Sequence, residues 1–322
     1  MARKRATRWG TAGPERAREG TSGHWPRQDW LVIELLKHVP KPIAYVLGGG
    51  GAYGSIHVGQ LRALAKTDLR PDFVVGTSVG SLNATIVAET PEIAHDRLAA
   101  FWSLVTREDV FGSARKMMVN LAALRPAIAD PTPLREMLLR STPSRDFSDL
   151  QLPLTAVAAD VTTGHHVELN SGDLISALMA STAIPGVFPV VEREGLRLVD
   201  GGILYNVPIS IAAEQGAQTI VVLDCGFNLF APRTDPTLPH ALLRAAAIMA
   251  SSQVRRDLLT YPDRTILYVP GKWPPASMPY DFSKAYENGT QSYEIAMDWP
   301  EGPKIKGAGL YGEPPDVTRV ES

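Results

Sequence analysis

The chain has 322 residues and a formal net charge of −2, with 44% hydrophobic and 20% charged residues. These values are ordinary for a soluble globular protein, and a net charge so close to zero gives no electrostatic reason to expect nucleic acid as a partner. The single cysteine, Cys225, excludes an intrachain disulfide and fits a reducing compartment, so the sequence favours a cytoplasmic protein.

The first part of the chain, residues 1–40, is predicted to be a basic and largely disordered leader. Arg3, Lys4, Arg5 and Arg8 lie among Gly, Thr and Pro, without the apolar stretch that a secretory signal requires. No segment of the chain reaches the roughly 18 uninterrupted apolar residues of a membrane span. Peripheral attraction of the leader to an anionic membrane surface and a solvated tail without a role are both open interpretations.

From Pro42 the pattern becomes that of an α/β protein. Residues 43–47 form an apolar run typical of a buried strand, a run of glycines follows, and 56–65 show helical spacing. Residues 72–75 predict a second strand, and another helix is expected after Ser78. This alternation predicts a three-layer α/β fold with a mostly parallel central sheet and helices on both faces.

Residues 92–142 are predicted to be helical and lack strand signals. Met117, Met118 and Leu121 within this insert are candidates for the walls of a substrate pocket. Two interpretations are open: the insert caps an active site or touches lipid, or its helices pack on the sheet in the ordinary way.

Strand and helix signals alternate again in the second half of the chain. Strands are expected at 154–159, 166–169, 197–200, 219–224 and 265–269, and helices at 174–180, 209–214 and 238–259. Because no internal repeat or linker interrupts the pattern, we expect one domain over residues 41–300 and a C-terminal tail over 301–322.

A serine motif carries the first part of the candidate chemistry. Gly76-Thr77-Ser78-Val79-Gly80 matches G-x-S-x-G directly after an apolar strand, which is the context of a nucleophile elbow. Gly76 and Gly80 allow a sharp turn, so that the hydroxyl of Ser78 stands clear of the backbone. Because a serine hydroxyl is a poor nucleophile until a neighbouring group accepts its proton, the motif requires a base elsewhere in the chain.

Asp200-Gly201-Gly202 is the preferred source of that base. Asp200 ends a predicted strand, which in a parallel sheet faces the ligand crevice, and Gly201 and Gly202 allow a tight turn after it. Among the seven histidines, only His240 follows a strand-terminal acid, Asp224, in the chain order of an α/β-hydrolase triad. A conventional triad through His240 is the alternative.

The glycine run after the first strand has two interpretations. Gly49-Gly50-Gly51-Ala52-Tyr53-Gly54 matches the G-x-G-x-x-G of dinucleotide folds, with Asp68 or Asp72 near the place of the ribose-binding acid. Alternatively, the amides of Gly49, Gly50 and Gly51 form an oxyanion hole at the N-terminus of a helix. The nucleophile elbow on the next strand favours the oxyanion hole, since a dinucleotide fold has no need for it.

Together, these motifs resemble the signatures of patatin-like phospholipases. The glycine run ending at Gly54 resembles the family's oxyanion loop, Gly76–Gly80 its nucleophile elbow and Asp200–Gly202 its aspartate motif. Residues 180–189 and 206–208 resemble the segments on either side of the aspartate. The resemblance covers about residues 42–225.

The resemblance implies a patatin-type α/β fold and a Ser–Asp dyad that hydrolyses acyl esters in lipids without a metal or cofactor. In that dyad Ser78 is the nucleophile and Asp200 its base, while Gly49, Gly50 and Gly51 supply the oxyanion amides. One departure from the family concerns Tyr53, which stands where the family usually has Arg or Lys. A cation there could help to bind phosphate head groups or brace the loop.

The expected activity is that of a serine acyl hydrolase of the phospholipase A or lipid esterase type, with an acyl lipid as substrate. Three alternatives are open. An esterase or thioesterase acting on soluble acyl compounds would use the same residues, a non-catalytic lipid-binding protein would keep only the fold, and a dinucleotide-dependent enzyme would use the glycine run. The sequence indicates no particular oligomeric state.

Overall fold

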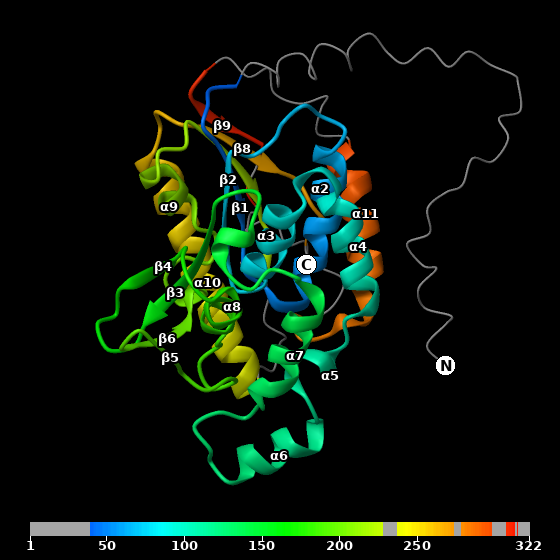
Figure 1. Cartoon of the computed structure of the whole chain (residues 1–322), viewed down its shortest axis with the longest axis vertical. Coiled ribbons are helices and arrows are strands. Elements are labelled where there is room, and N and C mark those ends of the chain that lie inside the picture. Colours follow the sequence, from blue (N-terminus) through cyan, green and yellow to red (C-terminus); the bar gives the residue numbers. More distant parts are fainter. Residues whose placement is uncertain (1–38, 228–236, 274–277, 298–306, 313, 315–322) are drawn as a thin grey trace, which may run out of the picture.

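The computed structural model describes residues 39–227, 237–273, 278–297, 307–312 and 314. Within these residues, one nine-stranded sheet carries helices on both of its faces (Figure 1). The strand order is β5-β6-β3-β2-β1-β7-β8-β9, with β4 also paired to β3. The predicted α/β fold with a mostly parallel central sheet is therefore confirmed.

Most of the strands run parallel, and only those near β3 reverse direction. The parallel strands are β3 (Leu154–Asp160), β2 (Phe73–Thr77), β1 (Ile43–Leu47), β7 (Thr219–Leu223), β8 (Thr265–Val269) and β9 (Gly309–Tyr311). The antiparallel strands are β4 (His166–Leu169), β5 (Val191–Arg193) and β6 (Leu196–Asp200). The central strands are almost continuously apolar because both faces of the sheet are buried.

Alternate residues of each central strand face two different cores. In β1, Tyr45 and Leu47 belong to the larger core, whereas Ala44 and Val46 belong to the smaller one. The larger core packs against α2 (Ile56–Leu64), α3 (Val79–Glu89), α4 (Ala94–Leu104), α8 (Leu174–Ser181) and α11 (Ala285–Met297). The smaller core packs against α9 (Ile209–Glu214) and α10 (Leu238–Thr260). These are the three predicted layers.

The insert over residues 92–142 is helical, as predicted. It contains α4, α5 (Arg107–Phe111), α6 (Ala114–Ala122) and α7 (Pro131–Ser141). The helices α4, α5 and α7 bury residues in the larger core, whereas α6 buries none. Figure 1 shows α6 standing away from the body of the protein, beyond α5 and α7.

Two short strands were not predicted. The strand β5 pairs with β6 as a hairpin, and β9 pairs with β8, so the sheet extends into residues 301–322, which the sequence assigned to a tail. Residues 1–38 of the predicted leader lie outside the described residues. Among the helices that the structure describes, none combines the length and the apolar character needed to cross a bilayer.

Candidate active site

Ser78 occupies the sharp turn between β2 and α3. Its φ of 54° and ψ of −130° are strained for a residue with a side chain. The turn needs glycine on either side, because a Cβ on Gly80 would lie 2.1 Å from the Leu47 carbonyl oxygen and one on Gly76 would lie 2.5 Å from the Gly80 carbonyl oxygen. Strand, strained serine and helix together have the geometry of a nucleophile elbow.

The backbone of Ser78 is held by two neighbouring serines. The Ser78 amide donates to Ser181 Oγ at 3.1 Å, and Ser181 Oγ in turn donates to the Val157 carbonyl at 2.7 Å. Ser81 Oγ donates to the Ser78 carbonyl at 2.7 Å. Ser181 lies within residues 180–189, which resemble the segment before the aspartate motif, but it was not predicted as a site residue.

Asp200 reaches Ser78 from the opposite direction along the sheet. The strand β2 ends with Thr77 paired to Val157 of β3, and the antiparallel β6 ends with Asp200 paired to Ala158. At Val157 and Ala158, one edge of β3 is paired with β4. The strands β2 and β6 therefore both pair with the opposite edge of β3, where they lie end to end. The prediction that Asp200 ends a strand is therefore confirmed, but the expectation that this strand runs parallel to its neighbours is wrong. The register of the antiparallel strand brings the aspartate to the serine instead.

The carboxylate of Asp200 accepts a hydrogen bond from the Gly202 amide at 2.8 Å. Burial raises the pKa of Asp200 to about 6, although the interaction with the Ser78 hydroxyl and the Gly202 hydrogen bond oppose the rise. Gly201 leaves room for the turn, since a Cβ there would lie 2.4 Å from the Val157 carbonyl oxygen. Asp200 is therefore ionised above about pH 6 and then able to accept a proton from Ser78.

The glycine loop passes directly beside Ser78. A Cβ on Gly49 would lie 3.2 Å from the Cβ of Ser78. The Gly49 amide donates to the Asn206 carbonyl at 2.9 Å, and Asn206 Nδ2 donates back to the Gly49 carbonyl at 3.3 Å. Within the described part of the chain, the amides of Gly50 and Gly51 have no such acceptor. Gly49 and Asn206 thus fix the loop, and an oxyanion hole formed by the amides of Gly50 and Gly51 stays a prediction.

Tyr53 and His57 lie beneath this loop and not at its surface. Tyr53 is buried, and burial raises the pKa of its phenol. The ring of His57 is also buried, and Asn83 Nδ2 lies 3.0 Å from its Nδ1. Burial lowers the pKa of His57 to about 3, against the opposing effect of a hydrogen bond to the Leu223 backbone. Tyr53 therefore offers no cation to a head group, and His57 is a buried residue of α2.

The structure does not assemble the two alternative sites. Asp72 accepts from the Ile43 amide at 2.7 Å and from Lys41 Nζ at 3.2 Å, at the amino ends of the strands. The glycine loop follows the carboxyl end of β1. The acid and the glycine loop that a dinucleotide site would need therefore lie at opposite ends of the strands. His240 is in the first turn of α10, where its Nδ1 lies 2.6 Å from Thr237 Oγ1, and it does not line the pocket beside Ser78.

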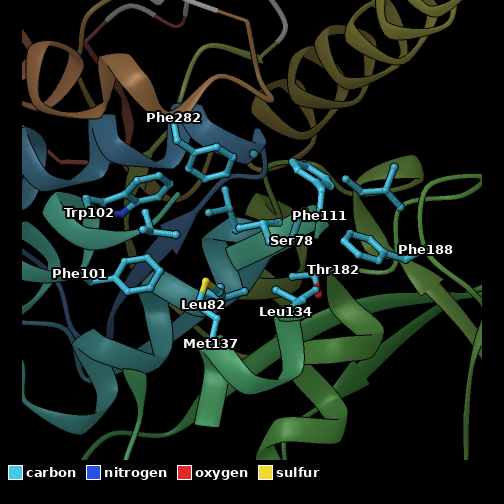
Figure 2. A pocket seen from close by; sticks show the side chains of 15 residues that line it. Ser78, Leu82, Phe101, Trp102, Phe111, Leu134, Met137, Thr182, Phe188 and Phe282 are labelled. Carbon is cyan, nitrogen blue, oxygen red and sulfur yellow. The ribbon is translucent and has the colours of Figure 1, made fainter. Parts of the chain in front are cut away.

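An apolar pocket of about 480 Å³, its open mouth included, lies beside Ser78 (Figure 2). Its aromatic lining includes Phe111 stacked on Phe188 and Trp102 stacked on Phe282. Much of the wall comes from the insert, through α4, α5 and α7. The structure thereby supports the interpretation that the insert caps the site.

The predicted wall residues Met117, Met118 and Leu121 do not line this pocket. They belong to α6, where Met117 packs against the larger core and Met118 and Leu121 are exposed. The prediction of a helix was correct, but helical spacing does not show what the helix faces. Within the described residues, no three side chains of His, Cys, Asp or Glu converge in a way that could hold a metal ion.

Comparisons with known proteins identify relatives of this chain. The model of the family described as "Patatin-like phospholipase" matches residues 45–213. Patatin-like phospholipase domain-containing protein 7 of Mus musculus is 30% identical over 187 residues, which are 57% of this chain and 14% of that protein. Lysophospholipase NTE1 of Mycosarcoma maydis is 27% identical over 209 residues, which are 62% of this chain and 10% of that protein. The chain thus matches only a small part of these relatives.

Among solved structures, human GIVD cytosolic phospholipase A2 in complex with methyl gamma-linolenyl fluorophosphonate is similar to this chain with a TM-score of 0.42 and 13% identity. The similarity covers 84% of this chain and 59% of that one.

Proposed function

The chain belongs to the patatin-like phospholipase family, and from this premise we propose that it is a serine acyl hydrolase that cleaves fatty-acyl esters of lipids. The observation that carries the proposal is the approach of the strained Ser78 to the buried Asp200, whose pKa the Ser78 hydroxyl lowers, beside an apolar pocket. In this proposal Ser78 is the nucleophile, Asp200 is the base that is ionised near neutral pH, and the apolar pocket takes the hydrocarbon chain.

In the proposed acylation step, Asp200 accepts the hydroxyl proton of Ser78 as Ser78 Oγ attacks the acyl carbonyl carbon. The developing oxyanion is bound by the Gly50 and Gly51 amides, each such donor contributing about 3–4 kcal/mol to transition-state stabilisation. The ester bond then breaks, and the departing alcohol or lysolipid takes the proton from Asp200. Ser78 is left as an acyl ester.

In the proposed deacylation step, Asp200 accepts a proton from a water molecule that attacks the acyl-Ser78 carbonyl. The same two amides bind the second oxyanion. When the acyl bond to Ser78 breaks, the proton returns to Ser78 Oγ and the fatty acid leaves. The walls of the pocket fit this chemistry because they offer an acyl chain apolar contacts and no charged group.

One observation favours an alternative substrate without a phosphate head group. Tyr53 is buried and uncharged where the family usually has a cation. A neutral lipid ester, or a soluble acyl ester or thioester, would not miss that charge. No comparable observation favours a non-catalytic protein, since the chain keeps Ser78, Asp200 and the glycine loop that the proposed reaction uses.

The test is a substrate panel for the wild type and two serine variants. We expect turnover of dispersed long-chain lysophospholipids or neutral acylglycerols that falls by at least about 10³-fold in Ser78→Ala. Ser103→Ala serves as the matched control, because Ser103 is on α4 and donates only to the Ala100 carbonyl. Unchanged turnover in Ser78→Ala would contradict the proposal, and a preference for short soluble esters would identify the soluble esterase instead.

A further inference from the structure

The helix α6 and the turn after it form the least covered apolar surface of the insert. Met118 is 72% exposed, Leu121 61% and Leu124 88%, and α6 has no buried residue. Met118 and Leu121 lie three residues apart and therefore share one face of the helix. No described element covers this face, and the helix projects from the body in Figure 1.

Leu124, which follows the last turn of α6, has a backbone conformation that is unfavourable for leucine. Its φ is 50°, in the left-handed region where glycine or asparagine is favoured. The backbone here is held by the Leu124 amide donating to the Leu121 carbonyl at 3.1 Å and the Arg125 amide donating to the Asn120 carbonyl at 3.0 Å, but the leucine side chain itself is 88% exposed. Such an outlier points to a use for the side chain outside the folded chain itself.

The charged residues within this segment are all of one sign. Residues 113–127 contain Arg115, Lys116 and Arg125 and no acidic residue, on a chain whose net charge is −2. Arg115 and Arg125 are exposed, and Lys116 pairs with Asp130 at 2.5 Å, which ties α6 to the start of α7. An exposed apolar face flanked by cations is the pattern of a helix that lies in the interface of an anionic membrane.

We propose that residues 113–127 dock on an anionic phospholipid bilayer. The segment lies between α5, which ends at Phe111, and α7, which contains Leu134 in its first turn. Both Phe111 and Leu134 line the pocket. Docking therefore positions the walls of the pocket at the lipid surface. The advantage for catalysis rests on the proposed function, whereas the docking itself requires no turnover.

The test measures partition of the full chain, carrying Ser78→Ala so that lipid is not consumed, into phosphatidylcholine–phosphatidylglycerol vesicles and into pure phosphatidylcholine vesicles. Met118→Gln with Leu121→Gln should weaken partition into the mixed vesicles by on the order of tenfold or more. Removing Arg115 or Arg125 by substitution with Gln should weaken it about fivefold each. Met249→Gln with Leu259→Gln, two exposed residues of α10, is the control that should change nothing.

Leu124→Asn separates docking from folding. It should raise the unfolding midpoint, because asparagine accepts a positive φ, and still weaken partition into the mixed vesicles. Unchanged partition in every α6 variant, or an equal loss in the α10 control, would overturn the proposal. Equally tight partition of the parent Ser78→Ala chain into pure phosphatidylcholine would overturn the anionic preference. Self-association that the α6 substitutions abolish, with partition unaffected, would assign the surface to a second copy of the chain.

The proposed function and the docking fail in different ways. Hydrolysis of a soluble ester by the wild type, and equally by Met118→Gln with Leu121→Gln, supports the active site whatever the vesicles show. A wild type that partitions through α6 but hydrolyses no ester would leave the docking in place and refute the hydrolase.

Discussion

Replacing Asp200 by asparagine should abolish turnover and yet stabilise the fold at alkaline pH. Burial raises the pKa of this carboxyl from 3.8 to about 6, so the native state binds its proton more tightly than the unfolded chain does. The stability that Asp200 contributes is thus fully present below about pH 4 and is lost as the pH rises through about 6. A difference of about two pKa units corresponds to a loss of about 3 kcal/mol.

Asparagine keeps the shape of the side chain and can accept the hydrogen bond from the Gly202 amide, but it carries no charge to bury. Asp200→Asn should therefore be more stable than the wild type by up to about 3 kcal/mol near pH 8, and the difference should vanish near pH 4. Urea unfolding of both proteins at the two pH values measures this. Asp263→Asn, at an exposed position, controls for the substitution itself.

Two results would refute the reasoning. If Asp200→Asn were no more stable than the wild type near pH 8, or if the difference did not depend on pH, burial would not be raising the pKa of this carboxyl. If the variant kept wild-type turnover, the base for Ser78 would be another residue.

Three further predictions test the base, the pocket and the elbow. The value of kcat/KM should rise with pH with a midpoint near 6 and then reach a plateau, because Asp200 must be ionised to act as the base. The variant His57→Gln should keep this midpoint even if its rate falls, because His57 with a pKa of about 3 is neutral throughout the range. A shifted midpoint in this variant would implicate the histidine. Leu134→Trp should fill the pocket and shift kcat/KM towards shorter acyl chains in a chain-length series, and an unchanged profile would place the acyl chain elsewhere. Gly80→Ala should destabilise the fold by about 3 kcal/mol or more in urea unfolding, because its Cβ would lie 2.1 Å from the Leu47 carbonyl oxygen; a wild-type midpoint would contradict that packing.

The central strands were predictable because their apolar runs report burial on both faces. The direction of a strand was harder to predict, since the residue pattern of a run such as Arg197–Asp200 does not depend on the direction in which the strand runs. The signal for the direction of β6 is Glu194-Gly195, a two-residue loop between β5 and β6 with φ of 53° and 81°. Positive φ at both positions is typical of a tight hairpin, which makes β6 antiparallel to β5. Strand β9, with only three residues, is too short for a periodic signal.

The candidate dyad was predictable because backbone constraints leave motifs in the sequence. Glycines beside Ser78 and after Asp200 mark places where a Cβ would collide with main-chain oxygens. The pocket leaves no such mark. Phe111, Phe188 and Phe282 come from distant segments, and an aromatic residue that lines a cavity looks the same in sequence as one that fills a core.

Labelling with a fluorophosphonate, followed by mass spectrometry of the modified peptide, tests the central claim most directly. The account predicts one covalent adduct, on Ser78, that forms faster as the pH rises through about 6 and more slowly in Asp200→Asn. A folded wild type that forms no adduct, or forms it on another residue, would contradict the assignment of Ser78 and Asp200 as nucleophile and base.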